Sequence, residues 1–204
     1  MQPVDLALCL AVDVSASVDY DEFGLMIGGL AGAFRAADIA AACAAGPHGA
    51  VGVALLFWSS AQEVAVPWMR IGDAAEAGVV ADAIENAPRL PAPGATALGP
   101  GMAAGLALLG RFPAEATRLV LDVSGDGAHN QGRPPAPVRD IGVAAGVTIN
   151  GLAVLNEEPD LLGHYESQVI GGPGAFAMHC ADYADFAEAI RRKLRREITG
   201  GMVA

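Results

Sequence analysis

The sequence predicts an α/β protein with a doubly wound, mostly parallel six-stranded sheet, one antiparallel edge strand and helices on both faces. Apolar runs alternate with segments of helical periodicity along the whole chain, as expected of successive strand–helix–strand units. The first run, residues 6–12, is apolar at every position and stops at Asp13. Such a run is typical of a strand buried on both faces of a parallel sheet.

The first part of the chain contains the edge strand. Residues 63–68 follow as an edge strand, in which Pro67 is tolerated only because an edge strand leaves backbone groups unpaired. The turn at residues 59–62 makes this strand antiparallel to the apolar run before it. The expected elements are a strand over 6–12, one long helix over 18–45, strands over 50–58 and 63–68, and a helix over 71–87.

The rest of the chain continues the alternation without a repeat or a linker. Its last helix is amphipathic, and its basic residues are expected on the solvated face. The expected elements are a helix over 99–112, a strand over 117–124, a short helix over 134–145, a strand over 147–155, a helical segment over 160–169, a short strand over 175–180 and a helix over 183–198. We therefore expect one domain over residues 1–204.

Composition excludes several classes of partner. A net charge of −11 opposes binding to nucleic acids or anionic membranes.

No apolar run approaches the ~18 residues of a transmembrane helix, and the first residues lack the basic and apolar regions of a signal peptide. The cysteines are Cys9, Cys43 and Cys180; a Cys43–Cys180 disulfide is conceivable, but free thiols fit their spacing better. Nothing in the sequence fixes the oligomeric state.

Asp13, Ser15 and Ser17 place a carboxylate and two hydroxyls at alternate positions after the first strand. This spacing can turn three oxygen atoms toward one point, and oxygen ligands suit a hard cation such as Mg²⁺ or Mn²⁺. The alternative is that one serine caps the following helix, since serine is a favoured N-cap residue. A cap accounts for one hydroxyl only, so we favour the metal site.

A second acid, Asp126, follows the strand at residues 117–124. In a sheet of order 3-2-1-4-5-6 the strands ending at Asp13 and Asp126 are neighbours across the point where the strand order reverses, where such sheets bind ligands. The Pro/Gly-rich loop that carries Thr96 lies between them in sequence. We expect it to close over the same crevice.

These motifs resemble the metal-ion-dependent adhesion site (MIDAS) of von Willebrand factor type A (vWA) domains. That site consists of D-x-S-x-S, a loop threonine and an Asp-Gly pair after the next strand, which Asp13, Ser15, Ser17, Thr96 and Asp126 match in order and context. The chain is most similar to a bacterial branch of vWA-like proteins, the DUF1194 family. Further segments that resemble this branch are residues 122–127, 139–140, 149–152, 169–176 and 193–197.

The resemblance implies a vWA fold, related to the Rossmann type, and a divalent cation held by these five residues. Mg²⁺ is the expected ion, with Mn²⁺ and Ca²⁺ as alternatives. Members of the branch commonly begin with an export signal, so the resemblance also implies an exported or periplasmic protein whose leader has been removed.

If Ser15, Ser17 and Thr96 supply neutral oxygens, and Asp13 and Asp126 supply the negative charge with one or both acting through water, a bound cation keeps positive character and an open coordination position. We therefore expect a non-enzymatic binding module that captures an Asp or Glu carboxylate of a partner protein. The alternative is a metal-assisted hydrolase that uses the same site. The sequence lacks the common hydrolase and nucleotide-binding motifs, and the nearby His129 is expected to be an ordinary loop residue.

The role of Asp122 is open, whereas one role is expected for the basic residues near the end of the chain. Asp122 either orients the turn at residues 124–127 or bonds to the backbone nearby. The basic residues Arg191, Arg192, Lys193, Arg195 and Arg196 are expected at the solvated face and the C-terminal end of the last helix, where the helix dipole favours positive charge.

Overall fold

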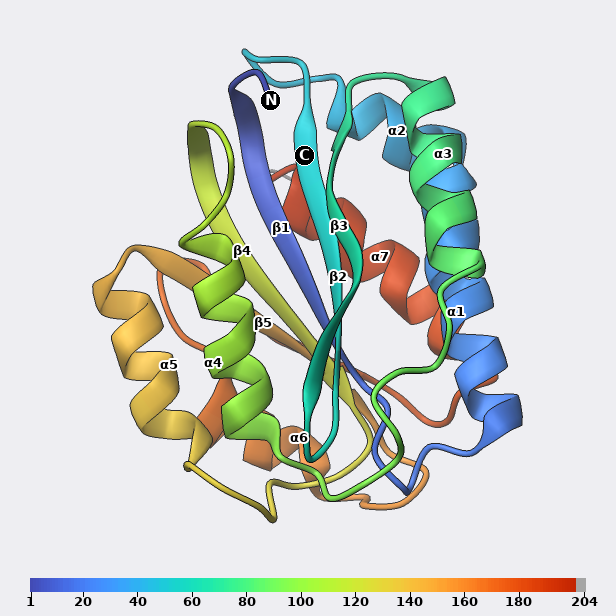
Figure 1. Cartoon of the computed structure of the whole chain (residues 1–204), viewed down its shortest axis with the longest axis vertical. Coiled ribbons are helices and arrows are strands. Elements are labelled where there is room, and N and C mark those ends of the chain that lie inside the picture. The colour runs from blue at the N-terminus through green and yellow to red at the C-terminus, as the bar shows by residue number, and fades with distance from the viewer. Residues whose placement is uncertain (201–204) are drawn as a thin grey trace.

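The sheet has the strand order β3-β2-β1-β4-β5-β6, as predicted (Figure 1). The computed structural model describes residues 1–200. Only β3 runs antiparallel to its neighbour, and all other neighbouring strands are parallel. The strands are β1 (Val4–Asp13), β2 (Val51–Trp58), β3 (Gln62–Ile71), β4 (Ala116–Gly125), β5 (Val147–Val154) and β6 (Ala177–Cys180).

Helices cover both faces of this sheet, so the predicted α/β architecture is confirmed (Figure 1). Helices α1, α2, α3 and α7 lie on one face, and α4, α5, α6 and η1 lie on the other. The helices are α1 (Tyr20–Arg35), α2 (Ala37–Cys43), α3 (Ala74–Glu85), α4 (Leu98–Leu109), α5 (Pro135–Ala144), α6 (Leu161–His164), the π-helical turn η1 (Tyr165–Val169) and α7 (Phe186–Ile198).

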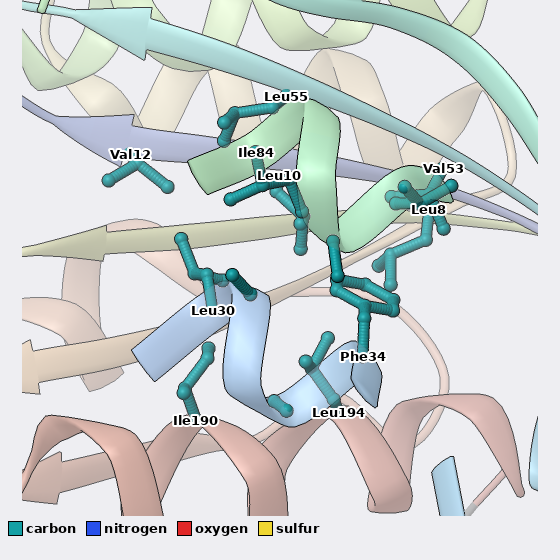
Figure 2. Close-up of a cluster of buried hydrophobic side chains, with 14 of the residues drawn as sticks. Leu8, Leu10, Val12, Leu30, Phe34, Val53, Leu55, Ile84, Ile190 and Leu194 are labelled. Carbon is teal, nitrogen blue, oxygen red and sulfur yellow. The ribbon is translucent and has the colours of Figure 1, made fainter. Parts of the chain in front are cut away.

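Strand β1 is the centre of both cores because its side chains alternate between the two faces. Leu8, Leu10 and Val12 pack under α1, α3 and α7, together with Leu30 of α1 and Ile190 of α7 (Figure 2). The intervening small residues of β1, Ala7, Cys9 and Ala11, face the second core under α4. Full burial on both faces explains why the strand has no polar residue from Leu6 to Val12.

The prediction of one long helix over residues 18–45 is wrong. Ala36 adopts an extended conformation (φ −70°, ψ 131°) and separates α1 from α2, and the two helices are bent by 64°. The bend keeps Ile39 and Cys43 of α2 in the core. Periodicity did not reveal it because the alanine-rich sequence favours helix on both sides of the break.

No single helix in residues 1–200 is long and apolar enough to cross a membrane; α1 and α2 meet that criterion only when they are taken together across their bend. The three cysteines are free and buried, as expected.

The prediction that Lys193 belongs to the solvated face of α7 is also wrong. Its side chain is fully buried, and its Nζ lies 2.5 Å from Asp122 Oδ1 and 2.7 Å from Glu197 Oε1. Asn150 on β5 donates a hydrogen bond of 2.9 Å to Glu197. Helical periodicity places Lys193 and Glu197 on the same face as Ile190 and the other buried residues of α7, so this burial was readable from the sequence. Asp122 therefore anchors α7 to β4.

Candidate metal centre

Asp13 and Asp126 meet at the carboxyl edge of the sheet. Asp13 is the last residue of β1, and Asp126 follows directly after β4. The two strands are adjacent and parallel, with Val12 opposite Ser124 in the register. Both carboxylates are fully buried. The two strand ends therefore lie next to each other, as predicted.

A chain of hydrogen bonds links the two carboxylates through the serines. The Ser15 backbone N–H donates to Asp13 Oδ1 at 2.7 Å. The hydroxyl oxygens of Ser15 and Ser17 lie 3.1 Å apart, and Ser17 Oγ donates to Asp126 Oδ1 at 2.6 Å. These contacts thus connect four of the five predicted site residues, each to the next.

The serines do not cap the following helix, so the alternative interpretation of this segment is wrong. The N-cap of α1 is Asp19, whose side chain accepts a hydrogen bond of 2.8 Å from the Glu22 backbone N–H. Glu22 in turn accepts from the Asp19 backbone N–H at 2.8 Å, which completes a capping box. Both serine hydroxyls are therefore available to the site.

Thr96 approaches the same site from the loop before α4. Its backbone N–H donates to Asn130 Oδ1 at 2.9 Å, and its carbonyl accepts from the Asn130 N–H at 3.1 Å. A Cβ at Gly127 would lie 3.3 Å from Thr96 Oγ1, so the threonine hydroxyl lies beside the residue that follows Asp126. Asn130, to which the sequence assigned no role, fixes Thr96.

The metal-free site is electrostatically unfavourable. Burial, and secondarily the Asp126 charge, raises the pKa of Asp13 to about 8. Burial also raises the pKa of Asp126, against the hydrogen bond from Ser17. The Oδ2 atoms of both residues are buried and have no hydrogen-bond partner. Buried carboxylate oxygens normally have a partner, so this donor set fits a cation.

No cluster of three or more His, Cys, Asp and Glu residues suited to a metal is found among residues 1–200. The candidate site combines two acids with three hydroxyls, which is a different kind of ligand set. Oxygen-only ligands suit Mg²⁺, Mn²⁺ or Ca²⁺ better than soft metals.

Arg89 supports the serine-bearing loop, and sequence reasoning missed it. Its guanidinium donates to the backbone carbonyls of Ser15, at 3.3 Å, and Val18. It also lies over the ring of Tyr20, 5.2 Å from the centroid. Its charge opposes the rise in the Asp13 pKa. Nothing in the local sequence marks this arginine, because its contacts are made with residues 69 to 74 positions away.

His129 lies beside the site but faces α4. Its Nδ1 accepts a hydrogen bond of 3.5 Å from the Gly99 backbone N–H, and its own backbone N–H donates to His164 Nε2 at 3.4 Å. This engagement agrees with the expected role of a loop residue.

The family described as a protein of unknown function (DUF1194) matches residues 3–202 of the sequence. The chain belongs to the DUF1194 family. This confirms the resemblance inferred from the motifs. No curated protein matches the sequence at a significant level.

Solved structures similar to this DUF1194 chain include vWA domains. Proximal thread matrix protein 1 from the mussel byssus has a TM-score of 0.69 at 14% identity, over 96% of this chain and 48% of that one. The pilus adhesin SpaC from Lactobacillus rhamnosus GG has a TM-score of 0.69 at 15% identity, over 98% and 31%. A von Willebrand factor type A protein from Catenulispora acidiphila has a TM-score of 0.64 at 16% identity, over 96% and 43%.

These likenesses establish a vWA fold for the DUF1194 chain, which spans less than half the length of each of the three proteins. A further structure of the mussel protein is described as having a zinc-occupied MIDAS motif, with a TM-score of 0.65 at 14% identity. The matched proteins are named as matrix, adhesin and vWA proteins.

Proposed function

We propose that this protein is a metal-ion-dependent binding module that captures a carboxylate of a partner protein through a divalent cation. The observation that carries the proposal is the pair of buried carboxylates with unpartnered Oδ2 atoms, joined by two serine hydroxyls at one edge of the sheet. The proposed ligands are Asp13, Ser15, Ser17, Thr96 and Asp126, acting directly or through water.

The proposed ligands would leave a bound cation with positive charge, and this charge favours binding of a partner's carboxylate. Two carboxylates compensate a divalent charge only in part when one or both act through water, and the three hydroxyls contribute no charge. A bound cation would supply positive charge and an open coordination position. Mg²⁺ gives up its water reluctantly, so a partner's Asp or Glu, which gains a charge-assisted contact, is the expected ligand.

Similar structures support the ion, the partner class and the location, although none identifies them here. The mussel protein with zinc at its MIDAS motif supports a divalent cation, and oxygen ligands favour Mg²⁺, with Mn²⁺ or Ca²⁺ as alternatives. The pilus adhesin and the PilB minor pilin from Streptococcus sanguinis support binding to protein and an exported location.

Both cores share one sheet, which supports a single domain.

The rim of the site restricts the partner. Asp19, Asp21 and Glu158 are exposed around it, and the whole chain carries a net charge of −11. A generally acidic partner would be repelled. The partner is therefore expected to present one acid on a neutral or basic surface.

The hydrolase alternative requires a general base beside the site. His129 is the nearest candidate, but its Nδ1 accepts from Gly99 on α4. The geometry thus favours the binding module. A hydrolase would turn over phosphate or carboxylic esters and lose that activity in the Asp126→Ala variant.

Water-proton relaxation of the Mn²⁺-loaded protein tests capture directly, because an open position holds an exchangeable water molecule. A capped glutamate is expected to displace this water and lower the relaxation enhancement. A capped glutamine, which has the same shape without the charge, should leave it unchanged. Equal responses to both compounds, or no enhancement above that of the Asp13→Ala protein, would contradict the proposal.

A further inference from the structure

Two of the three tyrosines are buried, and one of them, Tyr165, lies at the candidate metal centre. Tyr165 and Tyr183 are 0% and 3% exposed, whereas Tyr20 is 80% exposed. The Tyr165 hydroxyl lacks a hydrogen-bond partner. A buried tyrosine normally uses its hydroxyl, and packing alone would be served by phenylalanine. This hydroxyl therefore needs an explanation in the site beside it.

Tyr165 projects from the π-helical turn η1 toward Asp13. A Cβ on Gly125 would lie 3.0 Å from the Tyr165 hydroxyl and 2.9 Å from Asp13 Oδ2. The absent side chain of Gly125 thus leaves one space flanked by both oxygen atoms. The Tyr165 ring packs against Gly151 of β5, which fixes its direction. π-helical turns are often found at functional sites.

We propose that Tyr165 is a positioning residue of the metal centre, whose hydroxyl holds Asp13 in the orientation that binds the cation. This inference rests on the proposed function. In the cation-bound protein the hydroxyl donates to the carboxylate directly or through water. Ligating carboxylates are commonly oriented by such hydrogen bonds. The Ser15 N–H occupies Asp13 Oδ1, and the Tyr165 hydroxyl lies beside Oδ2, which has no partner.

Calorimetric Mn²⁺ and Mg²⁺ titrations of the Tyr165→Phe protein test the proposal. Loss of such an outer contact typically weakens metal binding by about 10- to 100-fold, and we expect a change of about 10-fold for this variant. Tyr20→Phe is the matched control, because it removes the same atom from an exposed ring, and its affinity should equal that of the wild type.

A second measurement separates positioning from packing. In the metal-free protein, the change in Tm caused by Tyr165→Phe should shrink when Asp13 is replaced by Ala. A purely structural tyrosine would give the same change in both backgrounds.

The two proposals fail differently. If the wild type binds metal and Tyr165→Phe binds it as Tyr20→Phe does, the positioning role is overturned and the proposed function stands. If the wild type binds neither metal, both are overturned. Equal Tm changes for Tyr165→Phe in the two backgrounds overturn the positioning role of Tyr165.

Discussion

Without a cation, the buried carboxylate of Asp13 is only partly stabilised by the protein around it. It is fully buried, it lies near a second buried carboxylate, and one of its oxygens has no partner. The Ser15 N–H and the charge of Arg89 offset part of this cost. The remaining cost is the physical reason to expect a cation, since a bound ion removes the repulsion between Asp13 and Asp126.

The stability of the metal-free protein should fall as the pH rises from about 4 to about 8. The pKa of Asp13 is raised from 3.8 to about 8 in the folded state, so between these values the folded protein holds a proton that the unfolded chain has lost. The stabilisation is complete below the unfolded pKa and is lost as the pH rises through the folded pKa. One such group gives a slope of up to about 1.4 kcal/mol per pH unit.

Urea denaturation with EDTA across this pH range measures the slope. Glu197, whose pKa burial raises to about 8, contributes with the same sign, so the comparison must be with Asp13→Asn. The wild type should show the steeper decline. Parallel profiles for the two proteins would contradict the assigned environment of Asp13.

At the scale of the helix, α1 contains two adjacent glycines in opposite environments. Gly28 is exposed, and a Cβ there would meet no atom within 4 Å. Gly29 is buried against α7, where a Cβ would lie 3.0 Å from the Ala187 Cα. Close approach of the two helix backbones thus requires the second glycine and not the first.

Gly28→Ala should therefore stabilise the protein by about 0.5–1 kcal/mol, because alanine restricts the unfolded chain and favours helix. Gly29→Ala should destabilise it by about 1–3 kcal/mol through overpacking against α7. Urea denaturation of the two variants measures both changes. Shifts of the same sign would contradict the described packing of α1 on α7.

Helix α7 is held by the buried Lys193, which bonds to Asp122 and Glu197. Lys193→Met should cost about 3–5 kcal/mol, because it leaves two buried carboxylates without their cation. Arg192→Met, on the exposed side of the same helix, should change stability by less than about 0.5 kcal/mol. Chemical denaturation compares them, and a similar small effect of both would show that the buried pair contributes little.

At the scale of the molecule, the sequence predicted the sheet order, the antiparallel edge strand and the meeting of Asp13 with Asp126. Apolar runs identify strands, and the topology of doubly wound sheets then places their ends together. The break at Ala36 was missed because it depends on how α2 returns to the core, which periodicity does not encode. Arg89 and Tyr165 were missed because each reaches the site from a distant segment of the chain.

The binding of a divalent cation by Asp13 and its neighbours is the central claim, and calorimetry with added Mg²⁺ or Mn²⁺ tests it most directly. The wild type should bind the ion, and its Tm should rise with ion concentration because the ion binds only the folded state. Asp13→Ala should fold, since it removes the repulsion, but its Tm should not respond. An equal response of the Tm in both proteins, or none in the wild type, would contradict the claim.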